Sequence, residues 1–289
     1  MKVAVIGANG QLGTDICQVF RENNHTVVEL NHDRLEVKDI DQVSTLLKDI
    51  KPEVVINTAA AHHLEKCELN PEQAFLINSI GARNVALVAK EVNSTLIWIS
   101  TDYVFNGKKR SPYIEKTPVS PLNTYGISKV AGEFCIKESC RKYFIVRTSG
   151  LYGLAPCRAK GENFVVKMLR LAKEKKEISI VNNEILTPTW TYSLAKQILH
   201  FCKCSSIPYG IVHSTDEGEC SWFEFAKEIF RNASIKIKLI PVKTTSFSSA
   251  VHRPNYSVLE NKILKKHKKN IMQHWKKSIA NYLKLYLGR

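Results

Sequence analysis

The sequence of 289 residues contains no apolar run of about 18 residues, the length that a membrane-spanning helix needs. Residues 1–6 lead directly into Gly7, so the N-terminus lacks both the length and the cleavage site of a signal peptide. We therefore expect a cytoplasmic protein that has no membrane partner.

Cysteine is present eight times, but no two cysteines form a C-x-x-C pair. The closest two, Cys202 and Cys204, do not have the spacing of a structural zinc site, and we predict no metal. Scattered cysteines without an export signal are more typical of reduced thiols than of a disulfide framework.

Acidic residues are few: 27 Asp and Glu accompany 42 Lys and Arg, which gives a formal charge of +15. Such an excess can indicate a nucleic acid, an anionic surface or an anionic small molecule as partner. No zinc-finger spacing or RNA-binding signature accompanies it. Many of the lysines follow residue 262 among Leu264, Ile271 and Trp275, a pattern that favours a helical region with a solvated basic face. We therefore predict no nucleic-acid partner.

The N-terminal region predicts a unit of strand, glycine-rich turn, helix and strand. The continuous apolar run over residues 2–6 is typical of a buried parallel strand, and a second strand is expected over residues 26–30. Between them lie Gly-Ala-Asn-Gly-Gln-Leu-Gly, at residues 7–13, and a helix with an apolar face. In this context the glycine pattern predicts a dinucleotide-binding site.

The three glycines of the turn have separate physical roles in such a site. Gly7 permits the tight turn, Gly10 lets a pyrophosphate approach the backbone, and Gly13 lets the helix pack closely on the strand. The unpaired N–H groups at the N-terminus of the helix then face the phosphates.

The residues after the second strand bear on the choice between NADP and NAD. A carboxylate at this point usually binds the ribose 2′-hydroxyl of NAD. Here the strand is followed by Asn31, His32, Asp33 and Arg34. Asn31 carries no charge that repels a 2′-phosphate, and His32 and Arg34 could bind one, whereas Asp33 argues for NAD. We predict NADPH as the cofactor, with NADH possible.

Further strands alternate with helices along the chain, which implies a Rossmann-type, doubly wound and mainly parallel α/β sheet. Ligands of such sheets bind beyond the carboxyl ends of the strands, and Gly7, residues 59–61, Thr101 and Thr148 all stand at such ends. Strands are expected over 53–57, 95–100, 144–148 and 211–214, and a long helix over 71–90.

Tyr125 and Lys129 are four residues apart, so in a helix both side chains lie on one face. An ammonium beside a phenol stabilises the phenolate and lowers the pKa of the tyrosine, which provides a proton donor or acceptor near neutral pH. The bare spacing is common, and it also fits an ordinary surface helix.

Several motifs occur together in this sequence. They are Gly-x-x-Gly-Gln-Leu-Gly at 7–13, Asn-Thr-Ala-Ala-Ala at 57–61, Ile-Ser-Thr-Asp-Tyr-Val-Phe-Asn-Gly at 99–107, Tyr-Gly-x-Ser-Lys-x-x-Gly-Glu at 125–133 and Arg-Thr-Ser at 147–149. In this combination the chain resembles the extended short-chain dehydrogenase/reductase superfamily, and within it the dTDP-4-dehydrorhamnose reductase family. The similarity extends from Met1 to about Leu283.

The resemblance implies a catalytic role for three residues. Tyr125 would donate a proton to the 4-oxo group of a sugar, and Lys129 would bind the nicotinamide ribose and lower the pKa of Tyr125. Thr101 would donate a hydrogen bond to the carbonyl oxygen, although it could also be only a strand-end cap. Together they would form a small oxyanion site with its own acid.

The resemblance also implies two sets of binding residues. Asp39 and Ile40 match a pair that contacts adenine, although Asp39 could be only a helix N-cap, and Arg253 would bind the substrate diphosphate or form an ion pair. The cofactor set is Gly7, Gly10, Gln11, Leu12, Gly13, Asn31, Arg34, Asp39, Ile40, Ala59, Ala60, Ala61, Tyr125 and Lys129. The substrate set is His63, Thr101, Asp102, Tyr103, Gly150 and Arg253.

The chain departs from the family pattern beside the sugar. Many relatives have Tyr-Thr where this sequence has His62 and His63, and many have Trp where it has Gly150. The catalytic residues are intact, so we expect reduction with an altered sugar pocket.

The expected organisation is a dinucleotide-binding domain over 1–152, to which 185–215 returns, and a smaller C-terminal substrate-binding lobe over 153–184 and 216–289. The expected activity is NADPH-dependent reduction of the 4-oxo group of a nucleotide-activated deoxysugar, most simply dTDP-4-dehydro-L-rhamnose, by a protein that could be a homodimer. Two alternatives stay open: another nucleotide-sugar reductase or epimerase, and a non-catalytic subunit resembling the regulatory subunit of methionine adenosyltransferase.

Overall fold

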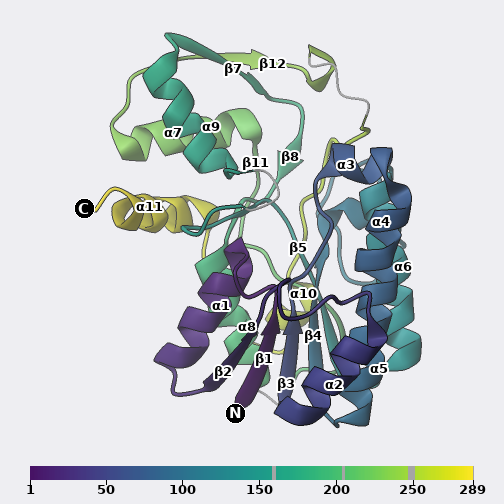
Figure 1. Ribbon diagram of the computed structural model, residues 1–289. Coiled ribbons are helices and arrows are strands. Elements are labelled where there is room, and N and C mark those ends of the chain that lie inside the picture. The colour runs from purple at the N-terminus through teal and green to yellow at the C-terminus, as the bar shows by residue number, and fades with distance from the viewer. Residues whose placement is uncertain (158–160, 204–205, 247–250, 289) are drawn as a thin grey trace.

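A six-stranded parallel sheet forms the centre of the computed structural model, which describes residues 1–157, 161–203, 206–246 and 251–288 (Figure 1). The strand order is β10-β5-β4-β3-β1-β2, and every neighbouring pair is parallel. This confirms the predicted α/β class. The strands are β1 (Lys2–Ile6), β2 (Thr26–Leu30), β3 (Val54–Asn57), β4 (Thr95–Thr101), β5 (Tyr143–Thr148) and β10 (Gly210–His213).

Helices cover both faces of the sheet, which explains why its strands are continuous apolar runs. One buried core joins the sheet to α1 (Gln11–Glu22) and α8 (Thr191–Cys202). A second core joins the opposite face to α2 (Ile40–Ile50), α5 (Ala82–Glu91) and α6 (Thr124–Ser139). None of the helices in the described part of the chain is long and apolar enough to cross a membrane.

The helix expected over 71–90 is divided into three parts. It begins as α4 (Pro71–Phe75), widens into a π-helical segment η1 (Leu76–Gly81) and continues as α5. The wide turn contains two buried polar residues, and both of them bond to Ser128 of α6: Asn78 Nδ2 donates to Ser128 Oγ at 3.0 Å, and Ser79 Oγ donates to Ser128 O at 2.8 Å. Sequence periodicity did not reveal this turn.

A separate apolar core lies outside the sheet layers, at the top left of Figure 1. It is built from α7 (Phe164–Glu174), β7 (Glu177–Val181), α9 (Trp222–Ala233), β12 (Lys238–Val242) and α11 (Trp275–Tyr286). Tyr152 and Trp190 also pack into this core. The sequence also predicts a strand over residues 235–241, and in the structure β12 begins three residues later, at Lys238.

Short elements connect these layers. The lysine-rich region is not one helix, because eight residues separate the end of α10 (Lys262–Lys266) from the start of α11, and one of them, Lys268, has a φ of +54°. The remaining elements are α3 (Leu64–Leu69), η2 (Asp102–Val104), β6 (Leu151–Tyr152), β8 (Ile185–Leu186), β9 (Thr189–Trp190), β11 (Cys220–Ser221) and η3 (Thr244–Ser246).

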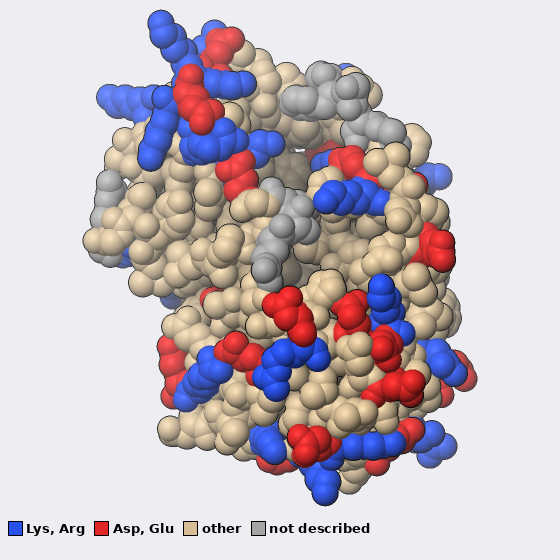
Figure 2. Space-filling model, viewed as in Figure 1, with Lys and Arg blue, Asp and Glu red and all other residues tan. Residues whose placement is uncertain are grey.

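Charged side chains are distributed unevenly on the face that Figure 2 shows. Basic side chains gather over α7 and the start of β7, at the upper left, and a few acidic ones lie among them. The sequence of this part contains Lys167, Arg170, Lys173, Lys175 and Lys176. Arg170 is paired with Glu162 and Glu174, so part of this positive charge is balanced locally.

A buried ion pair connects β5 to α6 behind the carboxyl end of the sheet. Arg147 Nε donates to Glu133 Oε1 at 2.8 Å, and Arg147 Nη2 donates to Oε2 at 2.5 Å. Ser100 Oγ donates a further bond to Glu133 at 2.7 Å. Both charged side chains are only 2% exposed, so each needs the other as its counter-charge in the protein interior.

Replacing Glu133 with Gln leaves the Arg147 guanidinium buried without its counter-charge. We expect Glu133→Gln to lower the free energy of unfolding by about 3–5 kcal/mol, the usual cost of removing one partner of a buried pair. Urea denaturation followed by circular dichroism measures the loss. Glu91→Gln is the matched control, because Glu91 pairs with Lys48 in solvent and should matter little. Equal stability of the two variants would contradict the prediction.

Candidate active site

The glycine-rich turn has the close packing that the sequence predicts. Gly7 has a φ of +76°, and a Cβ on it would lie 2.6 Å from Thr58 Oγ1. A Cβ on Gly13 would lie 2.2 Å from Gly7 O, so no larger residue fits there. Gly10 is the N-cap of α1 and provides no side-chain cap, which leaves the N–H groups of the first turn for an anion.

The other two predicted cofactor residues of this turn, Leu12 and Gln11, have different surroundings. Leu12 is buried in the core between α1 and the sheet, so only its backbone can serve a ligand. Gln11 Nε2 donates to Gly153 O at 3.4 Å and connects the turn to the segment after β6.

The segment that follows β3 lies beside the glycine turn. Thr58 N donates to Ile6 O at 3.0 Å, and Thr58 Oγ1 donates to the same oxygen at 2.8 Å. Asn78 from the π turn accepts from Ala61 N at 3.0 Å and donates to Ala61 O at 2.8 Å. The strand order reverses between β1 and β3, so Ala59, Ala60 and Ala61 lie where doubly wound sheets bind their ligands.

The residues predicted for the adenosine end are close to the surface. Asn31 Oδ1 accepts from Asn9 N at 3.0 Å, and Arg34 donates to Glu29 O at 3.0 Å. Asp39 is the N-cap of α2 and accepts from the backbone of Asp41 and Gln42, as the alternative interpretation expected. Ile40, next to it, is exposed.

Thr101 and Tyr125 meet at the carboxyl end of β4, and Lys129 reaches the backbone of Ile99 on the same strand. Tyr125 and Lys129 lie in the first two turns of α6, whose N-cap is Asn123, so the predicted helix is confirmed. Thr101 ends β4, and its side chain forms a hydrogen bond with Tyr125. Thr101 also accepts from Tyr103 N at 3.2 Å, so it caps η2 as well.

The pKa of Tyr125 does not follow the prediction. Burial raises it above its ordinary value, and the hydrogen bond with Thr101 opposes the rise only in part. Lys129 Nζ donates to Ile99 O at 2.7 Å and lies 3.7 Å from the centre of the Trp98 ring. Burial lowers the pKa of Lys129 to about 7, and Glu133 opposes this change. The expected lowering of the Tyr125 pKa by Lys129 is therefore wrong for this structure.

Asp102 and Tyr103 surround the phenol. Asp102 is buried and accepts from Thr101 Oγ1 at 3.1 Å and from Ser149 Oγ at 2.9 Å. Burial raises the pKa of its carboxyl above the ordinary range. The ring of Tyr103 stands edge-on to that of Tyr125, with centroids 5.8 Å apart.

Gly150 follows β5 with a φ of +57°, and a Cβ there would lie 2.8 Å from Leu186 Cδ1. A large aromatic residue cannot occupy this backbone position without rearrangement. Glycine at this position, where many relatives have Trp, is therefore matched by a backbone conformation that favours glycine.

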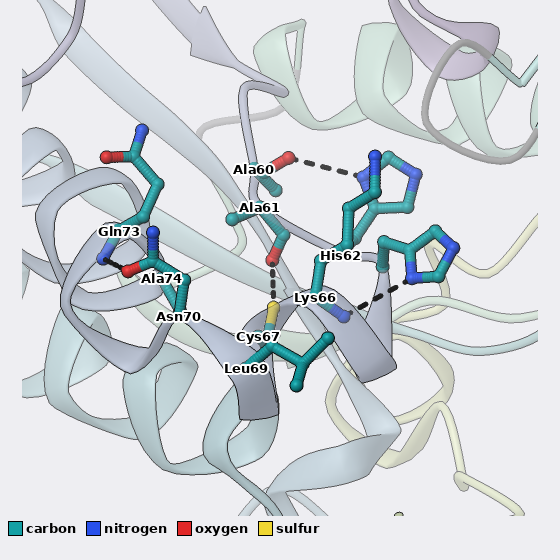
Figure 3. A pocket seen from close by; sticks show the side chains of 10 residues that line it. Ala60, Ala61, His62, Lys66, Cys67, Leu69, Asn70, Gln73 and Ala74 are labelled. Atoms are coloured by element: carbon teal, nitrogen blue, oxygen red, sulfur yellow. Dashed lines mark hydrogen bonds between the residues drawn. The ribbon is translucent and has the colours of Figure 1, made fainter.

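A cavity of about 370 Å³ opens beside the segment after β3 (Figure 3). Its lining comes from that segment and from α3 and α4. His62 Nδ1 lies 3.2 Å from Ala60 O, and Cys67 Sγ donates to Ala61 O at 3.5 Å. The lining residues are Ala60, Ala61, His62, His63, Lys66, Cys67, Leu69, Asn70, Gln73 and Ala74.

Arg253 has the ion pair that the alternative interpretation allowed. Its Nη2 donates to Glu65 Oε1 at 3.1 Å, and His63 Nδ1 lies 3.3 Å from the other oxygen of the same carboxylate. The backbone N–H of Glu65, Arg253 and His63 together hold the pKa of Glu65 below its ordinary value. Arg253 Nε is buried without a partner among the described residues.

Sequence reasoning missed four residues that contact the site: Glu65, Cys67, Asn78 and Trp98. Each of them interacts with a site residue that is distant in the sequence, and no local motif identifies them. No group of three His, Cys, Asp or Glu that could hold a metal ion occurs within 1–157, 161–203, 206–246 or 251–288, and Cys204 lies outside these ranges.

Known proteins resemble the chain along its whole length. A family model described as RmlD substrate binding domain matches residues 1–287. The spore coat polysaccharide biosynthesis protein SpsK of Bacillus subtilis (strain 168) is 36% identical over 283 residues, which cover 98% of this chain and 96% of that protein.

Two crystal structures are also similar. The dTDP-4-dehydrorhamnose reductase from Clostridium acetobutylicum ATCC 824 has a TM-score of 0.94 and 38% identity, covering 99% of this chain and 100% of that one. The enzyme of the same name from Bacillus anthracis str. Ames, solved in complex with NADP, has a TM-score of 0.93 and 39% identity, with 98% of each chain covered. The chain therefore belongs to the RmlD substrate-binding domain family of the extended short-chain dehydrogenase/reductase superfamily, and proteins named dTDP-4-dehydrorhamnose reductase are its homologues.

Proposed function

We propose that the protein reduces the 4-oxo group of a nucleotide-activated deoxysugar with NADPH, and that its substrate is dTDP-4-dehydro-L-rhamnose, which becomes dTDP-L-rhamnose. One observation carries the proposal: Thr101 and Tyr125 meet at the carboxyl end of β4, and Lys129 of the same helix as Tyr125 reaches Ile99 O of that strand, on the edge of the sheet that also carries the glycine turn. Membership of a reductase family supports it. An intact catalytic trio counts against a non-catalytic subunit.

The reaction adds a hydride to carbon 4 and a proton to oxygen 4 of the sugar. Tyr125 is the proton donor, and its raised pKa suits this role because the phenol keeps its proton until the oxygen becomes an alkoxide. Thr101 turns its one hydroxyl proton from Asp102 to the same oxygen and donates a hydrogen bond to it as its charge develops. Lys129 binds the nicotinamide ribose of the cofactor. The nicotinamide cofactor, when bound, provides the hydride.

The cofactor fits the residues that the structure places at the sheet edge. Gly7, Gly10 and Gly13 form a cradle in which added Cβ atoms would collide, and the backbone of the first turn of α1 is uncapped. Asn31 and Arg34 offer no carboxylate to a 2′-phosphate. The similar structure from Bacillus anthracis in complex with NADP supports this assignment.

The substrate lies, in this proposal, between the sheet edge and the outer lobe. Arg253 binds the diphosphate, and His63, Asp102, Tyr103 and Gly150 line the sugar. The division into a dinucleotide-binding domain and a substrate lobe is part of the proposal. So are a homodimeric state and a cytoplasmic location.

Three substitutions test the chemistry. Tyr125→Phe removes only the phenolic proton, and we expect kcat to fall by about 10² to 10⁴, the usual effect of a positioned general acid. Lys129→Met should lose a similar factor and also weaken cofactor binding. Thr101→Val should cost on the order of 10 to 10³, because one hydrogen bond to the oxyanion is lost. Steady-state oxidation of NADPH measures each rate, and full activity of Tyr125→Phe would refute the proposed site.

Cofactor choice is a separate prediction. We expect NADPH to bind more tightly than NADH, because Asn31 and Arg34 tolerate the 2′-phosphate. Fluorescence titration of the protein with each nucleotide gives both dissociation constants. The Arg34→Ala variant should lose about tenfold in NADPH affinity and little in NADH affinity. Tighter binding of NADH by the unmodified protein would overturn the preference.

The altered sugar pocket gives a third prediction. We expect His63→Thr to change the ratio of kcat/KM between different 4-oxo sugar nucleotides by about tenfold, because one pocket contact separates similar substrates by this order. His267→Thr, in the turn that follows α10, is the control. If His63→Thr leaves every ratio unchanged, the histidine is neutral for specificity.

A further inference from the structure

Lys129 lies in an unusual environment for a lysine. Its side chain is only 1% exposed, its Nζ donates one bond to Ile99 O, and the same nitrogen lies 3.7 Å from the centre of the Trp98 ring. A cation over the face of an indole is attracted by the negative potential of the ring, and most strongly where water is excluded. The ring therefore provides part of the solvation that burial removes from the ammonium.

The position of Trp98 is closely determined. Its side chain is buried at 1% exposure in the core between the sheet and α6. A Cβ on Gly132 would lie 2.9 Å from Trp98 Cη2, so the helix that carries Lys129 touches the edge of the indole. The backbone of α6 and the indole ring are therefore closely packed at Gly132.

We propose that Trp98 is a positioning residue of the active site, whose indole face holds the Lys129 ammonium where it serves Tyr125 and the cofactor. The inference rests on the proposed function, because Trp98 has this task only if Lys129 has one. Lys129 carries three N–H donors. One of them reaches Ile99 O and the face of the ring attracts the charge, so donors remain for a ribose hydroxyl of the cofactor.

The charged and titratable groups around Lys129 and its neighbour Tyr125 come from four elements. Tyr125 and Glu133 belong to α6 itself, and Arg147 comes from β5 and is neutralised by Glu133. Asp102 follows β4, and Cys67 comes from α3. Glu133 is the one group whose charge is found to raise the pKa of Lys129, against the lowering by burial.

Trp98 can also be read as a core residue that only fills space. In that case its replacement lowers stability and leaves the protonation of Lys129 unchanged. If the ring holds the ammonium, its removal disfavours the charged form, so the pKa of Lys129 falls further. Activity that needs the ammonium is then lost at a lower pH. The alkaline limb of the pH profile of kcat/KM separates these two roles.

The first test compares Trp98→Leu with Trp98→Phe in the whole protein. We expect Trp98→Leu to lose about 10- to 30-fold in kcat/KM at pH 8 and less at pH 6, with the alkaline limb moved down by about one pH unit. Its NADPH affinity, measured by fluorescence, should weaken in parallel. Trp98→Phe keeps an aromatic face and should recover most of both. Trp275→Leu, which removes a buried indole from the outer core, should not move the limb.

A second measurement decides the question if Trp98→Leu does not fold. Trifluorotryptophan weakens the negative face of the ring and nearly keeps its shape. Since the chain contains four tryptophans, it is incorporated into both the unmodified protein and Trp98→Phe. The alkaline limb should move to lower pH in the first protein and stay in place in the second.

The possible failures are distinguishable. If Tyr125→Phe is inactive while fluorination and Trp98→Leu leave the limb and the NADPH affinity of the unmodified protein in place, the role of Trp98 is refuted and the proposed function stands. If Tyr125→Phe keeps full activity, the proposed function fails, and the role of Trp98 fails with it.

Discussion

The close approach of α6 to the carboxyl end of β4 is the constraint on which the site depends. A Cβ on Gly126 would lie 2.4 Å from Tyr103 O, and one on Gly132 would lie 2.2 Å from Asn78 O. The helix can therefore lie against the strand end and the π turn at the same time. This contact brings the phenol of Tyr125 to the hydroxyl of Thr101.

Burial at this contact has opposite consequences for the two titratable groups. It raises the pKa of Tyr125 and lowers that of Lys129, because a low-dielectric environment disfavours both the phenolate and the ammonium. A proton donor must stay protonated until it acts, so the first effect helps the chemistry. The second effect must be opposed, and Glu133 opposes it through its charge. The buried pair with Arg147 fixes the position of that carboxylate.

Much of the fold could be predicted from the sequence because its signals are local. Apolar runs such as residues 2–6 marked the buried strands, and the glycines of residues 7–13 marked the turn whose backbone packs so closely. The spacing of Tyr125 and Lys129 placed both in one helix. The π turn at Leu76–Gly81 was missed, because a single wide turn hardly changes the pattern of apolar residues.

The rest of the site depends on contacts between distant parts of the chain. The direction of the Lys129 ammonium is decided by Trp98 and Ile99, about 30 residues earlier, and spacing within α6 contains no information on it. Arg253 and Glu65 are 188 residues apart in the sequence. The sequence alone therefore could not decide whether Arg253 binds a diphosphate or forms an ion pair. Asp39 caps α2, which a local pattern does reveal.

Gly150 constrains how this pocket can change. Its φ of +57° belongs to a region that side chains with a Cβ rarely adopt, and Leu186 Cδ1 and Thr187 O occupy the space that a side chain would need. An aromatic side chain at this position would strain the backbone and require the Leu186 side chain and the segment after it to shift. Natural variation or laboratory selection starting from this chain will therefore reach new sugar specificities more readily through the residues after β3 than through position 150.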